Sequence, residues 1–233
     1  MVNRMDRDVF LAASSGVSSF FLNLSESDMH ILEQVTSGGK TVLHVALQYK
    51  QFEAVSSIVR LSPSLVYSVD SRSNTPLHIA ARIGDLSTVK LILRQSEEGR
   101  WETGGQPNLL MMLNMDGDNA LHVAVRHGNR EVVEELISRN SEELARIKNC
   151  AGESALFLAV DRQDYALASS ILDRAPDCSF EGRHGMNVLH ALVIHTSTCK
   201  CSPIQLLKYM DCAYFAYTSQ SYRKLIIRMS SFY

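Results

Sequence analysis

The chain has 233 residues, with 23 Lys and Arg against 25 Asp and Glu, and 45% of its residues are hydrophobic. This composition is that of a globular protein, and it excludes a wholly disordered chain, a collagen and a coiled-coil rod. The formal net charge of −2 gives no reason to expect nucleic acid as a partner, because phosphate binding requires a concentrated positive field. Length alone is compatible with one large domain or two small ones.

No targeting or membrane-spanning segment stands out in the sequence. Residues 1–8 lack the apolar stretch of a secretory signal, and the longest uncharged stretch, residues 9–25, is broken by serines and falls short of a bilayer span. Four of the five cysteines lie at or beyond Cys178, outside any repeated pattern, which favours reduced thiols over a disulfide framework. We therefore expect a soluble, cytoplasmic protein.

One apolar pattern recurs along the chain at intervals near 34 residues. Its clearest copy is residues 74–84, which read Asn-Thr-Pro-Leu-His-Ile-Ala-Ala-Arg-Ile-Gly. Successive copies are 34, 34, 44, 35 and 33 residues apart, and a period of this length is typical of a solenoid of stacked units. Aligned on one apolar position, the anchor, the copies are placed by Val9, Leu43, Leu77, Leu121, Leu156 and Leu189.

Each copy predicts a short helix with a defined start and end. Pro76 suits the first helical turn, where its missing N–H is not needed, and Gly16, Gly84 and Gly128 suit helix C-termini. In the first copy Arg7 takes the capping position, so this helix is expected either to fray or to be capped by Asp6. In the other copies the residue two before the anchor can accept a hydrogen bond from a free backbone N–H: Thr41, Thr75, Asn119, Ser154 and Asn187.

A second helix is predicted after each of the first helices. Apolar residues recur 12, 15 and 16 positions after the anchor, a spacing that places three side chains on one helical face. Small alanines three positions after the anchor let neighbouring helices approach closely, at Ala12, Ala46, Ala80, Ala124 and Ala159. The second-helix positions are Val55, Ile58, Val59, Val89, Ile92, Leu93, Val133, Leu136, Ile137, Ala168, Ile171 and Leu172, and a further apolar position lies 12 before the anchor, at Ile31, Leu65, Leu109 and Leu144.

The third interval is about ten residues longer than the others, which predicts an insertion at about 94–108. Glu97, Gly99, Gly104 and Pro107 indicate a flexible loop there. It contains Trp101, the only tryptophan. Two interpretations stay open: Trp101 is an aromatic anchor for a partner, or its ring packs back onto its own array.

The copy Thr75-Pro76-Leu77-His78-Ile79-Ala80 resembles the ankyrin-repeat signature, and the period matches the ankyrin unit. The resemblance implies an all-α solenoid of about six helix-turn-helix repeats over residues 1–208, with the first and last atypical. Residues 63–65 (Pro-Ser-Leu) and 114–122 (Asn-Met-Asp-Gly-Asp-Asn-Ala-Leu-His) look plant-like. They resemble plant ankyrin–transmembrane proteins of the accelerated-cell-death type, in which an ankyrin array precedes a membrane domain and serves defence and stress signalling.

Four histidines occupy the same repeat position, where Phe10 and Phe157 stand in the other two copies. Equivalent positions in a stack lie on the order of 10 Å apart, so these side chains are not expected to converge on a metal or a substrate. We interpret them as framework residues that form hydrogen bonds between adjacent repeats. They are His44, His78, His122 and His190.

The remaining chemical motifs are weak. His195, Cys199, Cys201 and Cys212 could supply metal ligands, but their spacing is looser than in zinc sites, and free thiols are the favoured interpretation. Residues 38–41 (Gly-Gly-Lys-Thr) resemble the end of a phosphate loop but lack the upstream glycine, and we interpret them as a turn before the helix that Thr41 caps. The sequence therefore predicts no catalytic site, cofactor or bound metal.

The resemblance also implies where a protein partner would bind, since ankyrin proteins use their turn tips and the exposed face of the first helix. The signs of charge at these positions are mixed, which suggests a polar protein surface and not a phosphate track. By position, the turns contribute Arg72, Ser73, Asp116, Asp118, Glu153 and Arg183, and the first helices contribute Gln48, Arg82, Arg126 and Asp161.

The C-terminal segment breaks the pattern. Residues 198–233 carry a net charge of +4, so the remainder carries −6, and no repeat is found in residues 209–233. This basic, aromatic segment either favours an anionic membrane surface or is a truncated end that lacks the family's membrane domain. We therefore expect the protein to be a protein-interaction module or scaffold in plant defence or stress signalling. The alternative is the cytosolic arm of a membrane-anchored transport or channel-like assembly.

Overall fold

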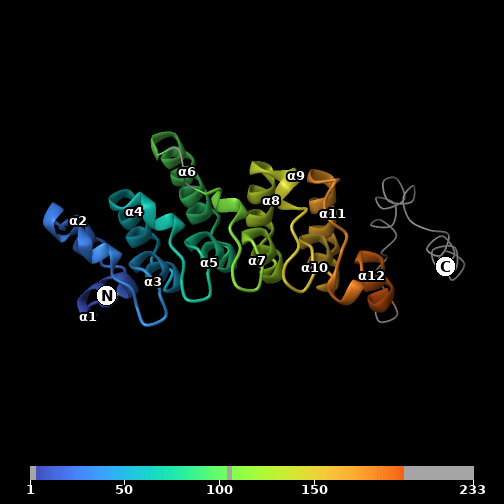
Figure 1. Cartoon of the computed structure of the whole chain (residues 1–233), viewed down its shortest axis with the longest axis horizontal. Helices are drawn as coiled ribbons and strands as arrows, with labels where there is room; N and C mark the ends of the chain where they lie inside the picture. Colours follow the sequence, from blue (N-terminus) through green and yellow to red (C-terminus); the bar gives the residue numbers. More distant parts are fainter. Residues whose placement is uncertain (1–3, 104–106, 197–233) are drawn as a thin grey trace, which may run out of the picture.

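The computed structural model describes residues 4–103 and 107–196, and within these ranges the protein is helical, with isolated β-bridges and no sheet (Figure 1). The α-helices are α1 (Arg7–Ser15), α2 (Ser18–Leu22), α3 (Val42–Gln48), α4 (Phe52–Leu61), α5 (Pro76–Ile83), α6 (Leu86–Thr103), α7 (Ala120–His127), α8 (Arg130–Arg139), α9 (Ser141–Leu144), α10 (Ala155–Asp161), α11 (Tyr165–Arg174) and α12 (Val188–Thr196). Four 3-10 helices connect them: η1 (Glu26–Glu33), η2 (Pro63–Tyr67), η3 (Leu109–Met111) and η4 (Arg183–Gly185).

The helices form an elongated, two-layered array (Figure 1). The first helices of successive units, α1, α3, α5, α7, α10 and α12, contact one another in that order and make the inner row. The second helices α2, α4, α6, α8 and α11 make the outer row in the same way. The connecting turns extend beyond the inner row (Figure 1). The predicted all-α solenoid of helix pairs is therefore confirmed.

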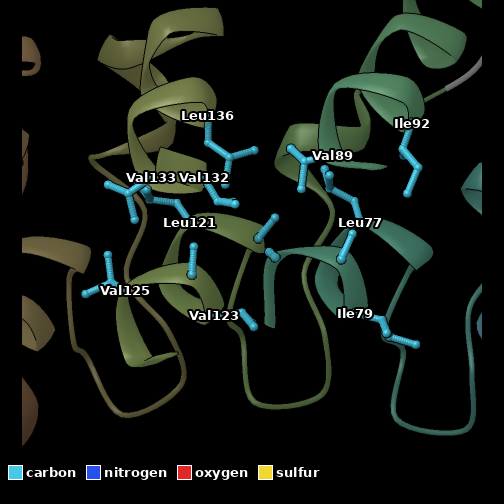
Figure 2. Close-up of a cluster of buried hydrophobic side chains, with 14 of the residues drawn as sticks. Leu77, Ile79, Val89, Ile92, Leu121, Val123, Val125, Val132, Val133 and Leu136 are labelled. Carbon is cyan, nitrogen blue, oxygen red and sulfur yellow. The ribbon is translucent and has the colours of Figure 1, made fainter. Parts of the chain in front are cut away.

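The core lies between the two rows and continues from unit to unit. Side chains of α5 and α6 meet those of α7 and α8, so that Leu77 and Ile92 belong to the same buried cluster as Leu121 and Leu136 (Figure 2). All twelve predicted second-helix positions and all five predicted alanines are buried. Ile31 is the exception at the position 12 before the anchor, because the 3-10 turn η1 buries Leu32 and leaves Ile31 half-buried.

The predicted flexible loop at about 94–108 is wrong over its first half. Helix α6 continues to Thr103, so Glu97, Gly99 and Trp101 lie in a helix. Ion pairs of Arg94 with Glu98 within α6, at 2.9 Å, and of Glu97 with Arg139 on α8, at 2.6 Å, stabilise this extension. Residues 104–106, with the two glycines of the insertion, lie outside the described residues.

The turns between units are small hairpins tied side by side. In each, a backbone N–H donates to the carbonyl four residues later. Except in the last turn, which begins at Gly182, the side chain of the first residue accepts hydrogen bonds inside the turn, as Asn114 Oδ1 does from the N–H groups of Asp116 and Asp118. Neighbouring tips are also joined: the Met115 N–H donates to the Arg72 carbonyl and the Cys150 N–H to that of Asp116, both at 2.9 Å. These bonds hold the row of tips in register.

A left-handed backbone conformation recurs four residues before five of the anchors. Gly39, Gly117, Gly152 and Gly185 adopt it, and Ser73 adopts it with φ 59°. At Gly117 a Cβ atom would lie 2.6 Å from the backbone nitrogen of Cys150, so the position tolerates no side chain. Sequence comparison between the copies makes Ser73 the strained member of the set.

We predict that Gly117→Ala destabilises the protein by at least about 1–2 kcal/mol, because it combines a left-handed alanine with a backbone clash. Ser73→Gly should stabilise it by up to about 1 kcal/mol, since glycine removes the strain. Gly38→Ala is the matched control, because its φ is not in the left-handed region and its added Cβ would meet nothing closer than 3.9 Å. Urea unfolding measures all three. Equal losses at residues 38 and 117 would contradict the assignment.

Candidate functional site

The predicted capping residues begin the inner helices. Hydroxyl or amide oxygens of four of them accept the backbone N–H three residues later, as in Asn119 Oδ1 from His122 at 3.0 Å and Ser154 Oγ from Phe157 at 3.1 Å. Thr75 and Asn187 do the same at 3.4 and 3.2 Å. At Thr41 the hydroxyl contacts the ring of His44 instead, 2.8 Å from Nδ1. The first helix has Asp6 at its cap position, but its carboxylate accepts from the Gln34 side chain and caps no backbone N–H.

Three of the framework histidines connect one unit to the next. His44 Nε2 lies 2.9 Å from the Asn74 carbonyl oxygen, His78 Nε2 lies 2.9 Å from that of Asp118, and His122 Nε2 lies 3.1 Å from that of Glu153. In each case Nδ1 faces the backbone N–H of the capping residue of the same unit. A neutral ring that accepts at Nδ1 and donates from Nε2–H satisfies both contacts. His190 contacts Asn187 in its own unit, 2.8 Å from Oδ1.

Burial sets the protonation of these rings. Burial lowers the pKa of His44, His78 and His122, and this effect outweighs the carbonyl hydrogen bonds and the nearby carboxylates, which raise it. The neutral form is therefore the one that the folded protein stabilises. The unfolded chain, with ordinary histidine pKa values, takes up protons more readily as the pH falls.

Arg126 on α7 joins two buried carboxylates of adjacent units. Its guanidinium donates to both Asp118 oxygens at 3.1 and 3.2 Å and to Glu153 Oε2 at 3.0 Å. Asn149 Nδ2 donates to the same two side chains at 2.9 and 3.0 Å. Burial alone would raise the pKa of Glu153, but the Asn149 hydrogen bond and the Arg126 and Arg183 guanidinium groups lower it overall. Glu153 is thus held ionised, and both carboxylates are engaged by Arg126 and Asn149.

Arg183 continues this network toward the C-terminal end of the array. It donates to Glu153 Oε1 and to both oxygens of Asp161, each at 2.9 Å. Its guanidinium carbon also lies 5.6 Å from the centre of the Phe157 ring, in cation–π geometry. Phe157 is the residue that replaces the framework histidine in this unit, so here an arginine on an aromatic face takes over the contact between units.

A groove of about 620 Å³ runs along the turns and inner helices of three successive units. Ile79 on α5 and Val123 on α7 are its apolar residues on the helices, and Met115, 66% exposed, lies at a turn tip. Six of the residues predicted to contact a partner line this groove: Arg72, Arg82, Asp116, Asp118, Arg126 and Glu153.

Two of these predictions are wrong about exposure, and other predicted residues do not line the groove. Asp118 and Glu153 were expected at exposed turn tips, yet each is only 4% exposed. Each lies at the end of its turn, directly before the capping residue of the inner helix, and pairs with Arg126. Gln48 is exposed outside the groove and accepts from Lys40, and Ser73 is half-buried in its turn.

Some predicted residues lie outside what can be described. The side chain of Trp101 is not among the described ones, so neither interpretation of it is tested. Cys199, Cys201, Cys212 and the segment 209–233 lie outside the described residues. Asn114 and Asn149 also line the groove and were not predicted from the sequence. Both lie seven positions before an anchor, and this recurrence could have identified them. The other groove residues are Asn74, His78, His127, Cys150 and Ala151.

Several features are not found in the parts of the chain that the structure describes. Over residues 4–103 and 107–196, no group of histidine, cysteine or acidic side chains has the arrangement of a metal site. Over the same ranges, none of the helices combines the length and the apolar character needed to cross a bilayer. Cys150 is an exposed thiol, and burial raises the pKa of the Cys178 thiol to about 12.

We predict that acidification weakens the array at mildly acidic pH. Because the folded-state pKa values of three histidines are lowered from 6.5, their contribution to stability is complete above about pH 6.5 and is lost as the pH falls below it. The thermal unfolding midpoint should drop by several degrees between about pH 7.5 and 5.5. His78→Gln should reduce this slope. A midpoint that stays constant over the interval would contradict the prediction.

We predict that Arg126→Met costs about 2–3 kcal/mol, because it removes the guanidinium that pairs with the buried Asp118 and one of the two that pair with the buried Glu153, while the guanidinium itself is partly solvated. Adding Glu153→Gln should recover part of the loss. Arg94→Met is the control: its partner Glu98 is 54% exposed, so the cost should be about 0–0.5 kcal/mol. Chemical denaturation distinguishes the two. Equal effects at residues 94 and 126 would show that the Arg126 network carries no special stability.

Comparison with known proteins agrees with this architecture. A family model described as ankyrin repeats in three copies matches residues 9–102 and 103–182. The chain is 25% identical to NAD-dependent deacetylase sir2B of Dictyostelium discoideum, 24% identical to Protein ACCELERATED CELL DEATH 6 of Arabidopsis thaliana and 32% identical to Ankyrin repeat-containing protein ITN1 of the same plant. These alignments cover 53%, 67% and 46% of this chain.

The same alignments cover 14%, 24% and 20% of those relatives, so the chain spans less than a quarter of the length of each. The three relatives bear names as different as a deacetylase and a cell-death protein. Their names therefore indicate no single activity for this chain. Because the family model matches residues 9–102 and 103–182, which are most of the chain, the protein belongs to the ankyrin-repeat family.

Proposed function

We propose that this protein is a cytoplasmic, non-enzymatic scaffold that binds a partner protein in the groove along its turns and inner helices. Ankyrin repeats imply protein–protein interaction, and the groove is the observation that supports this location. It is open to solvent, spans three units and combines polar groups with an exposed Met115. A mixed surface of this kind is typical of protein interfaces.

The pathway that we propose is plant defence or stress signalling. The support is the plant-like form of residues 63–65 and 114–122 together with the similarity to two Arabidopsis thaliana proteins, one of which is named for accelerated cell death. The same similarity supports a second candidate, the cytosolic arm of a membrane-anchored transport or channel-like assembly. That function requires membrane-spanning helices, and none lies among the described residues.

A photo-crosslinking experiment tests the groove. With a photoreactive phenylalanine at Met115, in the groove, irradiation in an extract of the source cells should give discrete adducts with partner proteins. The same residue at Arg60, exposed on the outer helix α4, is the matched control and should give few. Identical adduct patterns from both positions would contradict the assignment of the groove as the partner site.

A further inference from the structure

The groove is lined by equal numbers of arginine and acidic side chains, but these side chains are not equally accessible to a partner. Asp118 and Glu153 have side chains 5% exposed and are committed to Arg126. At the rim, the exposed Arg72 and Asp116 pair with each other at 3.2 Å. Arg82 is exposed, and no acidic group among the described residues pairs with its guanidinium. The accessible charge of the groove is therefore positive.

This unpaired cation belongs to a cluster at the ends of the inner helices, which we call the basic ridge: Arg82, His127 and Arg162. Arg82 is in the last turn of α5, His127 ends α7 and Arg162 follows α10. The Arg162 guanidinium donates to the Arg126 carbonyl, which holds it against the neighbouring helix end. Burial, and then the charges of Arg82, Arg162 and Arg126, lower the pKa of His127, as expected in a positive field.

The acidic side chains on the same helix ends form no ion pair with the ridge, because each has another partner. Asp161, the last residue of α10, accepts from Arg183 at 2.9 Å. Asp164, which caps α11, pairs with Arg130 at 2.5 Å. Asp85, ahead of α6, accepts from the Ser87 hydroxyl and the Thr88 N–H. The ridge thus has no committed counter-ion among the described residues.

We propose that the groove and the basic ridge next to it bind an extended, acidic segment of the partner protein, whose Asp or Glu carboxylates pair with Arg82 in the groove and Arg162 on the ridge while an apolar side chain packs on Met115. Guanidinium groups bind carboxylates bidentately, which makes arginine the suitable cation for this contact. Nucleic acid is disfavoured, because Asp116 at the rim and the −2 charge of the whole chain oppose a track of phosphates. This inference rests on the proposed function and adds the chemistry of the partner.

Selection from a displayed random peptide library on the full chain tests the inference. The enriched peptides should contain two or more acidic residues flanking an apolar one. The double variant R82A/R162A should bind a synthetic peptide of the enriched sequence at least about tenfold more weakly, which corresponds to about 1.4 kcal/mol, and added salt should weaken binding to the unmodified chain. Arg60→Ala, an exposed arginine on α4, is the matched control and should leave affinity unchanged.

A groove-filling variant separates the possible failures. Ala151→Trp introduces a large side chain at an exposed position of the groove. If the enriched peptides no longer bind A151W but bind R82A/R162A with unchanged affinity, the proposed carboxylate contact is wrong and the groove remains the partner site. Peptides insensitive to both variants would overturn the location as well. If no sequence is enriched, or if single-stranded DNA binds more tightly than any peptide, the inference fails, and cross-linking at residue 115 still decides the proposed function.

Discussion

The bond on which this array most depends is the one from a buried imidazole to the carbonyl of the following unit. His78 is an example: its Nδ1 faces the backbone N–H of Thr75, which caps its own helix, and its Nε2 lies 2.9 Å from the Asp118 carbonyl oxygen. Such a ring fixes the start of a helix and the position of the next turn together. In a stack where each unit contacts only its neighbours, repeating this bond at His44, His78 and His122 keeps the units that they join in one register.

The same turn residues serve stability and leave little for a partner. The backbone of Asp118 accepts the histidine bond, and its side chain pairs with Arg126, which also holds Glu153 of the next unit. Two acids that would otherwise balance the groove are withdrawn from solvent in this way. The charge that is accessible to a partner therefore depends on which ionisable side chains already pair within the protein. The side chains that do not pair in this way are the exposed arginines at the ends of the inner helices.

Much of the fold could be predicted from the sequence because the copies of the repeat can be compared with one another within one chain. The anchor Leu77 and the second-helix residue Ile92 recur in phase in several units, and a period of this kind permits few arrangements other than stacked helix pairs. The insertion could not be predicted in the same way, because it has no counterpart in other units. Its glycines indicated a loop, yet Glu97 pairs with Arg139 on α8, a contact between residues far apart in sequence.

The sequence by itself determined the number of units, the helix starts, the buried stripes and the identity of the framework histidines, since each depends on local spacing and on residue type. Only the tertiary structure decided which polar residues meet. Asp116 and Asp118 are two positions apart, but one is exposed at the rim and the other is buried under Arg126. Charge pairing depends on the distance between side chains of different units, and a repeat pattern does not contain that distance.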